Sequence, residues 1–487
     1  MTKQAAELRY AVRLRVVFKY FGQLCLVLAA LTVVTLLMSL FFGERDISLR
    51  YAMVVTVLIA LGLVLSRLPA PSSVQPNEGL VLVALMFLFT PLMMVYPMMA
   101  AGMGFVDAFF EAISGVTTTG LSTMATLAGA PATFLFSRAW MQWYGGLGIV
   151  ILSLGLAMQP GLVAKGLVVT EAEAHDLVGG TRAHARRVMK VYVALTVIGI
   201  LGALLLGVDL FDAVLYTFSA VSTGGFAPYD SSLSVFGWPA QLWVSLLCLA
   251  GAVSLAFYHR VYRQRHLMPG DFSQVRALLI AGLVISLLLG ISMRSGSDMP
   301  WATILHHAPV LAVSAQTTAG FASMPCSQLN ADSKLILIFS MLVGGGVGST
   351  AGGFKLLRLL IAVSVFRFIL LRTCLPPHAV VEPRLEGRIL EGNEIQEALL
   401  LILLFVVVVS LSWLAFVAMG FDPLDSLFEV ASATGTVGLS VGITNSALPA
   451  LLKGVLCVDM LMGRLEIIAW LVLLYPGTWF GRRMEVK

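Results

Sequence analysis

The chain has 487 residues, of which 59% are hydrophobic and only 12% are charged, and its mean hydropathy is +0.93. A soluble domain carries about 25% charged residues, so this composition excludes an ordinary soluble globular protein. The formal net charge of +5 gives no indication of a nucleic-acid partner. The short alternating segments typical of a membrane β-barrel are absent, which leaves a polytopic helical membrane protein.

Ten apolar segments are each long enough to cross a hydrocarbon core about 30 Å thick. The first lacks a clean small-residue cleavage site, so we expect a retained span instead of a signal peptide. The eighth is too long for one uninterrupted helix and contains the sequence GGGVGSTAGG. In chain order, the expected spans are 18–42, 50–66, 78–100, 132–158, 188–208, 238–260, 274–293, 333–370, 396–419 and 447–475.

Four shorter apolar segments lie between these spans, near 105–116, 210–221, 303–315 and 424–433. Clusters of Lys and Arg mark the cytoplasmic loops of helical membrane proteins. All the basic clusters of this chain fall on one side only if the ten spans cross the membrane and the four short segments do not. The charge pattern therefore predicts four re-entrant segments and places both termini in the cytoplasm.

The four re-entrant segments share the pattern Ser-x3-Thr-x-Gly-[Leu/Phe]-[Ala/Ser]. Small residues at helix-packing contacts would explain one copy, but they do not explain the same register four times. The repeated glycines are Gly120, Gly225, Gly320 and Gly438. The threonines two residues before them are Thr118, Thr223, Thr318 and Thr436. The serines six residues before them are Ser114, Ser219, Ser314 and Ser432.

This repeat predicts a cation filter. Non-helical backbone at membrane depth is tolerated only where it is buried in protein or lines a watery cavity. An extended Thr-x-Gly stretch aims successive carbonyl oxygens at one axis, and four such stretches form oxygen rings that replace the hydration shell of a cation. We expect K⁺ at these rings and no covalent cofactor. The expected filter residues are Thr118, Thr119, Gly120, Thr223, Gly224, Gly225, Thr318, Ala319, Gly320, Thr436, Val437 and Gly438.

Charged residues near the filter have two expected roles. Thirteen residues before the four glycines stand, in chain order, Asp107, Asp212, His307 and Asp425. We expect the three aspartates to cap the pore helices, because carboxylates stabilise helix N-termini. Glu111 and Glu429 are expected to add negative potential at an outer mouth, which is the weaker of the two interpretations.

Six stretches are together specific enough to indicate a family. They are FFEAISGVTTTGLST (109–123), MQWYGGLGIVIL (141–152), STGGFAPYD (222–230), TTAGFASM (317–324), GGGVGSTAGGFKLLR (344–358) and MGRLEII (462–468). With them the chain resembles, over nearly its whole length, the Trk/Ktr family of bacterial potassium transporters. The two spans before the first repeat resemble the membrane subunit of the Trk branch, and the fourth loop, TGTVGLS (434–440), resembles the Ktr branch.

The resemblance implies an all-α membrane fold, with two N-terminal transmembrane helices and four tandem helix–pore-helix–helix units around a central pore. It implies a homodimer with one pore per subunit, and a cytosolic nucleotide-binding regulatory subunit of the TrkA type with RCK domains. Within the family, glycine at all four filter positions accompanies potassium preference. The expected division is 1–75 for the two N-terminal helices, 76–158 for unit 1, 159–268 for a cytoplasmic loop and unit 2, 269–372 for unit 3, and 373–487 for a cytoplasmic loop and unit 4.

The glycine-rich stretch 344–354 and Arg464 are the candidate gate. A phosphate-binding loop is excluded because Gly-Lys-[Ser/Thr] never occurs, whereas a plain helix kink stays open. The resemblance implies a flexible intramembrane loop beneath the filter, with Arg464 beside it as a positive charge that impedes cations. Pairing of Arg464 with Asp459 or Glu466 is the alternative, and Lys355 is expected to be a cytoplasmic-side anchor. The gate residues are then Gly344, Gly345, Gly346, Gly348, Gly352, Gly353 and Arg464.

Together these observations predict potassium uptake across the bacterial cytoplasmic (inner) membrane, in contact with lipid. A carrier that couples potassium to protons or sodium by alternating access is the alternative. Four repeats in one orientation favour a pore, because carriers commonly show inverted repeats. An enzyme is not expected, since the sequence offers no catalytic constellation. The cysteines have no metal-binding spacing and are expected to be packing residues: Cys25, Cys248, Cys326, Cys374 and Cys457.

Overall fold

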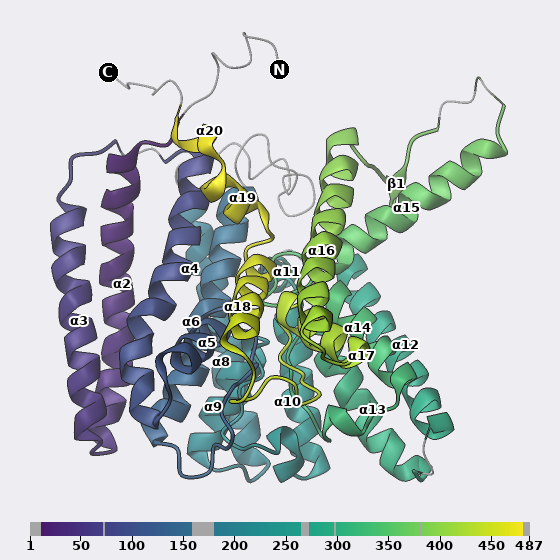
Figure 1. Ribbon diagram of the computed structural model, residues 1–487. Helices are drawn as coiled ribbons and strands as arrows, with labels where there is room; N and C mark the ends of the chain where they lie inside the picture. The colour runs from purple at the N-terminus through teal and green to yellow at the C-terminus, as the bar shows by residue number, and fades with distance from the viewer. Residues whose placement is uncertain are drawn as a thin grey trace.

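The computed structural model describes residues 11–71, 74–157, 180–263, 272–296, 299–376, 378 and 381–480. Within these residues the secondary structure is almost entirely helical. The sheet structure there is one short hairpin of two-residue strands, β1 (Arg384–Leu385) and β2 (Arg388–Ile389). Helices α2 (Leu14–Phe41) and α3 (Arg45–Ser66) pack against each other at one edge of the bundle (Figure 1). The prediction of two N-terminal helices is therefore confirmed.

Four units of similar design follow these two helices, and each contains a short central helix. The first unit comprises α4 (Pro76–Met98), α5 (Phe105–Val116) and α6 (Ala132–Ala157). The second comprises α8 (Gly180–Leu205), α9 (Leu210–Val221), α10 (Trp238–Ala252) and α11 (Leu255–Arg263). The third comprises α12 (Ser273–Gly296), α13 (Trp301–Gln316), α14 (Ala331–Val343) and α15 (Leu356–Thr373). The fourth comprises α16 (Gly392–Ala418), α17 (Pro423–Thr434), α18 (Ala450–Arg464), α19 (Ile468–Leu474) and α20 (Pro476–Trp479). Short 3₁₀ helices lie at Met99–Ala101, Ser232–Val235 and Cys326–Gln328.

The four short helices are the predicted pore helices. The expected segments 105–116 and 210–221 coincide with α5 and α9, and the segments 303–315 and 424–433 fall within α13 and α17. Each has 12 to 16 residues, which is too short to cross a hydrocarbon core that requires about 20. The all-α fold with four helix–pore-helix–helix units is confirmed.

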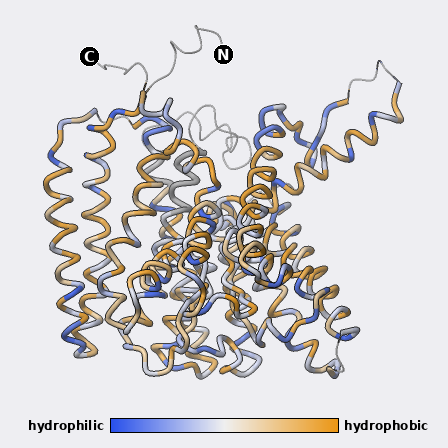
Figure 2. The backbone as a smooth tube through the Cα atoms, in the orientation of Figure 1, coloured by the Kyte–Doolittle hydropathy of each residue, from blue (hydrophilic) through white to orange (hydrophobic). Residues whose placement is uncertain are grey.

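Six of the described helices are long and apolar enough to span a membrane, and the pair α10 and α11 would make a seventh if counted as one span. This pair bends by 87°. Figure 2 shows apolar residues along the long helices and polar residues gathered near their ends. The molecule is therefore a multi-pass membrane protein.

Two breaks within expected spans are not predicted by the sequence. The first separates α10 from α11 in the span 238–260, and the second separates α18 from α19 in the span 447–475. The backbone groups freed at the first break bond to the glycine-rich loop: Gly346 N donates to Ala252 O (3.1 Å), and Leu255 N donates to Gly348 O (3.1 Å). Broken helices are tolerated at membrane depth when other parts of the protein satisfy their backbone in this way.

Helix α15 departs from the bundle. It begins near the centre of the molecule and runs outward beside β1, away from the other helices (Figure 1). The start of α2 and the end of α20 lie on the same side of the bundle (Figure 1). This arrangement agrees with an even number of crossings between them.

Candidate functional site

Each pore helix ends in the same backbone turn. In the first repeat, Thr119 N donates to Ser114 O (2.9 Å) and Thr118 N donates to Gly115 O (3.1 Å), which is the Schellman pattern of a helix C-terminus. The corresponding two bonds recur in the other three repeats. The residue at the left-handed position is a threonine each time, with φ between 50° and 55°: Thr118, Thr223, Thr318 and Thr436.

A left-handed threonine is an outlier. Its branched Cβ disfavours positive φ, and such a residue costs about 1–3 kcal/mol where the surrounding structure imposes it. Glycine is the usual residue at this position of a helix end, so four threonines indicate that the hydroxyl group is needed. Two of the hydroxyls, on Thr118 and Thr436, are buried and have no hydrogen-bond partner among the described residues. They are available to a bound cation.

The four filter glycines lie in a closed ring. Each has positive φ, from 71° to 99°, and each leaves no room for a side chain. A Cβ added to any one would collide with a carbonyl oxygen of the next repeat in chain order, and the fourth repeat meets the first. The colliding pairs are Gly120 with Gly224 O, Gly225 with Ala319 O, Gly320 with Val437 O, and Gly438 with Thr119 O.

A cavity of about 370 Å³ lies over this ring and is lined by all four filter glycines. Polar groups of the first and second units border it, including Arg138, Tyr229 and Asp230. Asp212 accepts a hydrogen bond from the Tyr229 hydroxyl (2.8 Å), and this bond raises the pKa of Tyr229 above its ordinary value. The C-terminal ends of the pore helices, which carry partial negative charge, lead directly into the ring. The site therefore combines backbone oxygens, helix C-termini and a polar cavity.

The glycine-rich loop between α14 and α15 lies against three of the four filter segments. Gly353 N donates to Gly435 O (3.0 Å) in the fourth segment, and Gly352 N donates to the Thr318 hydroxyl (2.7 Å) in the third. The Thr350 hydroxyl lies 3.3 Å from the Thr223 hydroxyl in the second. Because these contacts involve the residues at the start of each segment, the loop packs on the opposite side of the ring from the 370 Å³ cavity.

Close backbone contacts inside the loop explain its glycines. A Cβ on Gly344 would collide with Gly352 O, and one on Gly352 would collide with Gly435 O. Gly345 and Gly346 lie against Ala252, and Gly348 and Gly353 have φ of 73° and 72°. The six glycines therefore form one folded loop, and a plain helix kink does not describe it.

Arg464 is the last residue of α18 and is 3% exposed. Its Nη1 donates to Thr350 O (2.7 Å), while Nε and Nη2 have no partner among the described residues. Asp459 accepts instead from Ser412 (2.6 Å), and Glu466 pairs with Arg358 (2.5 Å). The alternative pairing of Arg464 with a neighbouring carboxylate is therefore wrong, and the structure places a buried guanidinium against the glycine-rich loop.

Comparison with known proteins agrees with this geometry. Residues 88–476 match the family model TrkH, described as a cation transport protein. The chain belongs to the TrkH family of cation transport proteins. It is 27% identical to an uncharacterized cation transporter of Methanocaldococcus jannaschii, over 93% of both chains. It is 30% identical to the Trk system potassium uptake protein TrkI of Halomonas elongata, over 95% of this chain and 96% of that one. Its fold is similar to the crystal structure of the potassium transporter TrkH from Vibrio parahaemolyticus, with a TM-score of 0.86 and 24% identity, over 96% of this chain and 100% of that one.

Within this TrkH-family fold, Glu111 and Glu429 do not lie free at an outer mouth. Both are completely buried behind the filter, where each holds the chain that leaves its filter segment. Glu429 accepts hydrogen bonds from the Ser440 hydroxyl (2.5 Å), Val441 N (2.9 Å) and the Thr444 hydroxyl (2.7 Å). These carboxylates are therefore bonded to local donors and are not exposed at an outer mouth, and their contribution to the negative potential there stays a prediction.

Glu111 makes the matching contacts in the first repeat. It accepts from the Ser122 hydroxyl and from Thr123 N (3.1 Å), and it forms a buried ion pair with Arg138 (3.2 Å). The Arg138 guanidinium also lies over the Phe226 ring, 3.9 Å from its centroid, and so joins the first unit to the second. The sequence does contain a signal for this shared supporting role, because both glutamates stand nine residues before a filter glycine.

Gln142 is a further supporting residue that the sequence analysis misses. It is buried on α6, four residues after Arg138 and therefore on the same helix face. Its Nε2 donates to Gly224 O (2.5 Å), and its Oε1 accepts from Phe226 N (3.1 Å). The second filter segment is thus held by a side chain from the first unit.

The three aspartates lie in the first turns of their pore helices as expected, but among the described residues none of them bonds to the helix backbone. Asp107 pairs with Lys453 (2.6 Å) and Asp425 pairs with Lys334 (2.6 Å), while Asp212 bonds to Tyr229. The cap of α17 is Asp422, which accepts from the backbone N–H groups of residues 424 and 425. The prediction that these aspartates cap the pore helices is therefore wrong. Their carboxylates bond to side chains distant in the sequence, and they do not bond to the free N–H groups of the helix.

One smaller expectation also changes. Lys355 is buried and donates to Ala351 O within the glycine-rich loop, so it is not a cytoplasmic-side anchor. His307 Nδ1 lies 3.0 Å from the Ser323 hydroxyl. No group of three or more metal-binding side chains occurs among the described residues. Cys374 is exposed, while the other four cysteines are buried and free, as packing residues are.

Proposed function

We propose that this chain conducts potassium ions through the ring of four filter segments. The observation that carries the proposal is the closure of this ring in chain order, with backbone oxygens of neighbouring repeats meeting at the four glycines. Rings of carbonyl oxygens replace the hydration shell of potassium in selective channels. Two relatives named as potassium transport proteins, from Halomonas elongata and Vibrio parahaemolyticus, support the same ion.

Serine substitution of Gly120 and Gly320 tests the filter. A side chain at either glycine displaces a carbonyl oxygen of the adjacent repeat, so potassium uptake is expected to fall and its preference over sodium to narrow. Uptake of both ions is measured in a bacterial strain that lacks its own potassium uptake systems. Gly104→Ser is the matched control, because Gly104 has no atom within 4 Å of an added Cβ and has negative φ. Unchanged selectivity in both filter variants would contradict the proposal.

The same proposal makes the glycine-rich loop and Arg464 the gate. An unpaired guanidinium buried at membrane depth is costly and is retained where it acts on an ion path. Arg464 bonds to the loop through Thr350 O, so its charge and the loop position are linked. Arg464→Ala is expected to raise ungated flux. Arg464→Lys keeps the positive charge but loses the planar guanidinium donors. It therefore distinguishes repulsion of the cation by the charge from the hydrogen bond that holds the loop. A fall in flux with normal expression of the alanine variant would contradict the gate.

We place the chain in a bacterial cytoplasmic membrane, with both termini in the cytoplasm, on the basis of its basic clusters. We also propose a homodimer and a cytosolic nucleotide-binding regulatory subunit. Copurification from membranes, followed by nucleotide analysis, tests the partner. Reversal potentials measured at several proton gradients distinguish a pore from a carrier coupled to protons, because a pore's reversal potential is independent of the proton gradient.

A further inference from the structure

The oxygens that meet at the four filter glycines are not equivalent. They are Thr119 O, Gly224 O, Ala319 O and Val437 O. Among the described residues, Gly224 O is the one of these four that accepts a hydrogen bond, and its donor is Gln142 Nε2 (2.5 Å). The second repeat therefore presents a different oxygen to an ion than the other three repeats do.

Gln142 holds the chain on both sides of the filter glycine Gly225. Its Nε2 donates to Gly224 O, and its Oε1 accepts from Phe226 N (3.1 Å). A backbone carbonyl can only accept a hydrogen bond and a backbone N–H can only donate one, so these two partners fix the orientation of the amide. Gln142 is completely buried, so bulk water does not compete for either group.

Helix α6 follows the second filter segment along its length. Residues Arg138, Gln142 and Gly146 lie on one face of this helix, because they are spaced by four residues. Gly146 packs against Ser222, and a Cβ added to it would collide there. At the other end of the segment, the Arg138 guanidinium lies over the Phe226 ring. The amide is therefore placed by a helix, which positions a side chain more precisely than a loop does.

The glycine at position 224 is explained by this amide. The equivalent residues of the other repeats have side chains: Thr119, Ala319 and Val437. A Cβ added to Gly224 would collide with the Gln142 amide, which contributes the three nearest atoms. The φ of Gly224 is not positive, so the backbone conformation does not itself require glycine. Gln142 and Gly224 are thus a matched pair.

Other units have apolar residues at the position of Gln142. In the first, second and fourth units, a glycine of the helix after the filter packs against a carbonyl at the end of the pore helix. These contacts are Gly145 with Val116 O, Gly251 with Val221 O, and Gly463 with Thr434 O. Gln142 stands three residues before the first of these glycines, and Cys248 and Met460 stand three residues before the other two. Cys248 is buried in one apolar cluster with Ala319 of the third filter segment.

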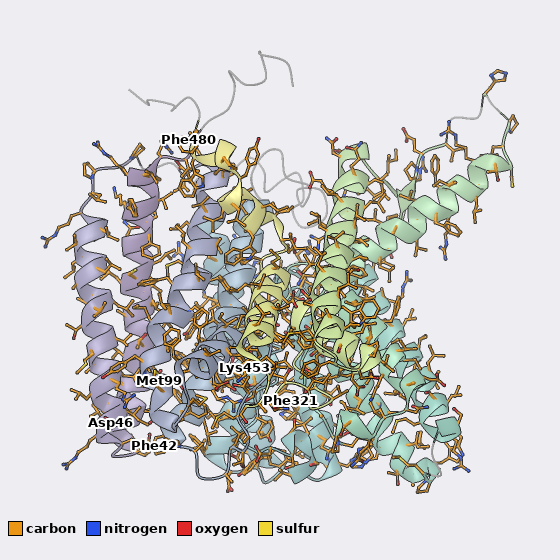
Figure 3. All side chains as sticks on the ribbon, in the orientation of Figure 1. Phe42, Asp46, Met99, Phe321, Lys453 and Phe480 are labelled. Atoms are coloured by element: carbon orange, nitrogen blue, oxygen red, sulfur yellow. The ribbon has the colours of Figure 1, made fainter. Side chains whose placement is uncertain are left out.

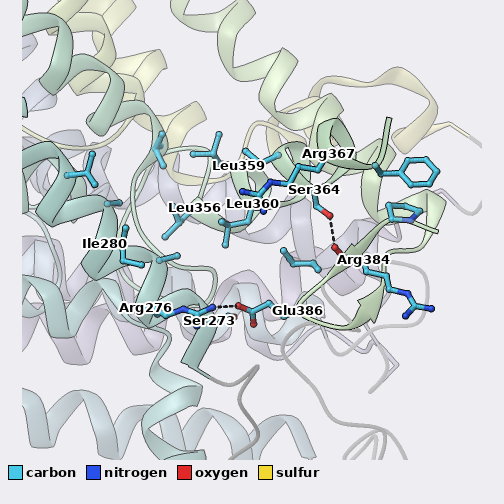
Figure 4. A pocket seen from close by; sticks show the side chains of 18 of the residues that line it. Ser273, Arg276, Ile280, Leu356, Leu359, Leu360, Ser364, Arg367, Arg384 and Glu386 are labelled. Atoms are coloured by element: carbon cyan, nitrogen blue, oxygen red, sulfur yellow. Dashed lines mark hydrogen bonds and ion pairs between the residues drawn. The ribbon is translucent and has the colours of Figure 1, made fainter. Parts of the chain in front are cut away.

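A second buried glutamine near the filter has different partners. Gln316 Nε2 donates to Gly344 O (2.7 Å) in the glycine-rich loop, and its Oε1 accepts from the Ser340 hydroxyl (3.0 Å). Gln316 also lines the pocket between α12 and α15 (Figure 4). Of these two glutamines, Gln142 is the one that bonds to an oxygen of the filter ring.

A donor behind a ring oxygen changes how that oxygen binds a cation. A carbonyl oxygen has two lone pairs, so Gly224 O can accept from Gln142 and still face an ion. The amide hydrogen carries partial positive charge, which lowers the negative potential that this oxygen presents. The number and field strength of carbonyl ligands affect the choice between potassium and sodium. Sodium is the smaller ion and gains more from strong ligands, so a weakened oxygen that is held in place disfavours it.

We propose that Gln142 is a positioning residue that sets the preference of the filter for potassium over sodium, by holding Gly224 O in the ring and weakening the field of that one oxygen. The inference rests on the proposed function, because it assigns the ion preference of the same ring to a side chain outside the repeat. Gln142 acts through Gly224 O and does not itself contact the ion.

Exchange of the matched pair tests this role. Gln142→Cys removes the donor, and Gly224→Ala added to it reproduces the residue pair of the third segment, Cys248 and Ala319. Uptake of potassium and sodium is measured in a bacterial strain that lacks its own potassium uptake systems. We expect the potassium-to-sodium ratio to fall about fivefold in Gln142→Cys, which is the effect of one ordinary hydrogen bond, and to stay low in the double variant.

Thermal unfolding of the purified full chain, in potassium chloride and in sodium chloride, is the second measurement. It shows whether each variant folds and which ion stabilises it. The double variant fills the space that Gln142→Cys leaves, so it keeps the test available if the single variant does not fold. Gln241→Met is the matched control, because Gln241 is buried on α10 and donates to Phe236 O (2.8 Å), outside the filter. Its ratio is expected to stay unchanged.

Three outcomes would overturn the role of Gln142. They are an unchanged ratio in Gln142→Cys, recovery of the original ratio in the double variant, which would indicate packing alone, and an equal fall in Gln241→Met. The first of these would leave the proposed function standing. Absence of potassium flux in the unmodified chain, with a potassium-specific thermal stabilisation that Gln142→Cys loses, would overturn the proposed function and leave the role of Gln142 standing.

Discussion

In the first and fourth repeats, the serine six residues before the filter glycine accepts a hydrogen bond from that glycine's N–H, at 3.0 Å in both cases. In the second and third repeats, the equivalent hydroxyls of Ser219 and Ser314 have no partner among the described residues. The buried glutamates follow the same division, because Tyr216 and Leu311 replace them in the second and third repeats. Two of the four segments are therefore held from behind by side chains of their own repeat.

The second and third repeats have a different support. Their left-handed threonines, Thr223 and Thr318, contact the glycine-rich loop, whereas the hydroxyls of Thr118 and Thr436 have no partner. A channel made from four identical subunits cannot divide tasks in this way. A single chain with four unequal copies can hold the first and fourth segments by side chains of their own repeat, while the threonine hydroxyls of the second and third contact the glycine-rich loop, which also bonds to Gly435 O of the fourth.

Among the variants that test this difference between the repeats, removal of the Glu429 carboxylate is expected to have the largest effect on stability and selectivity. Three donors bond to the Glu429 carboxylate. In Glu429→Gln the amide NH₂ group replaces one acceptor oxygen, so at least one of these donors loses its hydrogen bond. We expect the free energy of unfolding to fall by about 3 kcal/mol. Thermal unfolding of the purified protein and the ratio of potassium to sodium uptake measure it. Tyr216→Phe, at the equivalent position of the second repeat, removes one hydrogen bond and is the control. Similar losses in both variants would remove the distinction between the repeats.

Thr350→Val is expected to have an intermediate effect, on gating and not on selectivity. The Thr350 hydroxyl lies within hydrogen-bond distance of Val221 O (3.0 Å) and Gly251 O (2.9 Å), and valine loses both contacts. Because the hydroxyl has one proton to donate, about 0.6 kcal/mol is lost for one such bond in a membrane protein, and ungated potassium flux is expected to rise about threefold. Thr444→Val, which removes a donor from Glu429, is expected to change selectivity without this rise. If Thr350→Val changed selectivity and Thr444→Val raised ungated flux, the loop contacts and the glutamate contacts would not have separate roles.

The smallest expected effect distinguishes the four serines. Ser114→Ala and Ser432→Ala each remove an acceptor from a filter glycine and cost about 0.6 kcal/mol, which is less than a threefold change in the potassium-to-sodium ratio. Ser219→Ala and Ser314→Ala remove hydroxyls without partners and are expected to leave the ratio unchanged. An equal change in all four variants would indicate that the serines act through packing alone.

The sequence predicts the pore helices and the filter register well, because both depend on local signals. The apolar segments 105–116 and 210–221 are bounded as the helices are, and the Thr-x-Gly pattern repeats in one register. The breaks after α10 and α18 are not predicted, since the first bonds through its backbone to the distant glycine-rich loop and the second follows Arg464, whose side chain bonds to that loop. The partner of Asp107 is Lys453, 346 residues further on, and no local pattern marks such a pair.

The ion pair that Lys453 (labelled in Figure 3) forms with Asp107 also marks the place where the fourth unit meets the first. Polypeptide joins units one, two and three to their successors, but this seam closes without a covalent connection. A ribosome must therefore release nearly the whole chain before the circle of oxygens is complete. Under the proposed function, partial translation products that lack the fourth segment contain pore helices but no complete ring for an ion to cross.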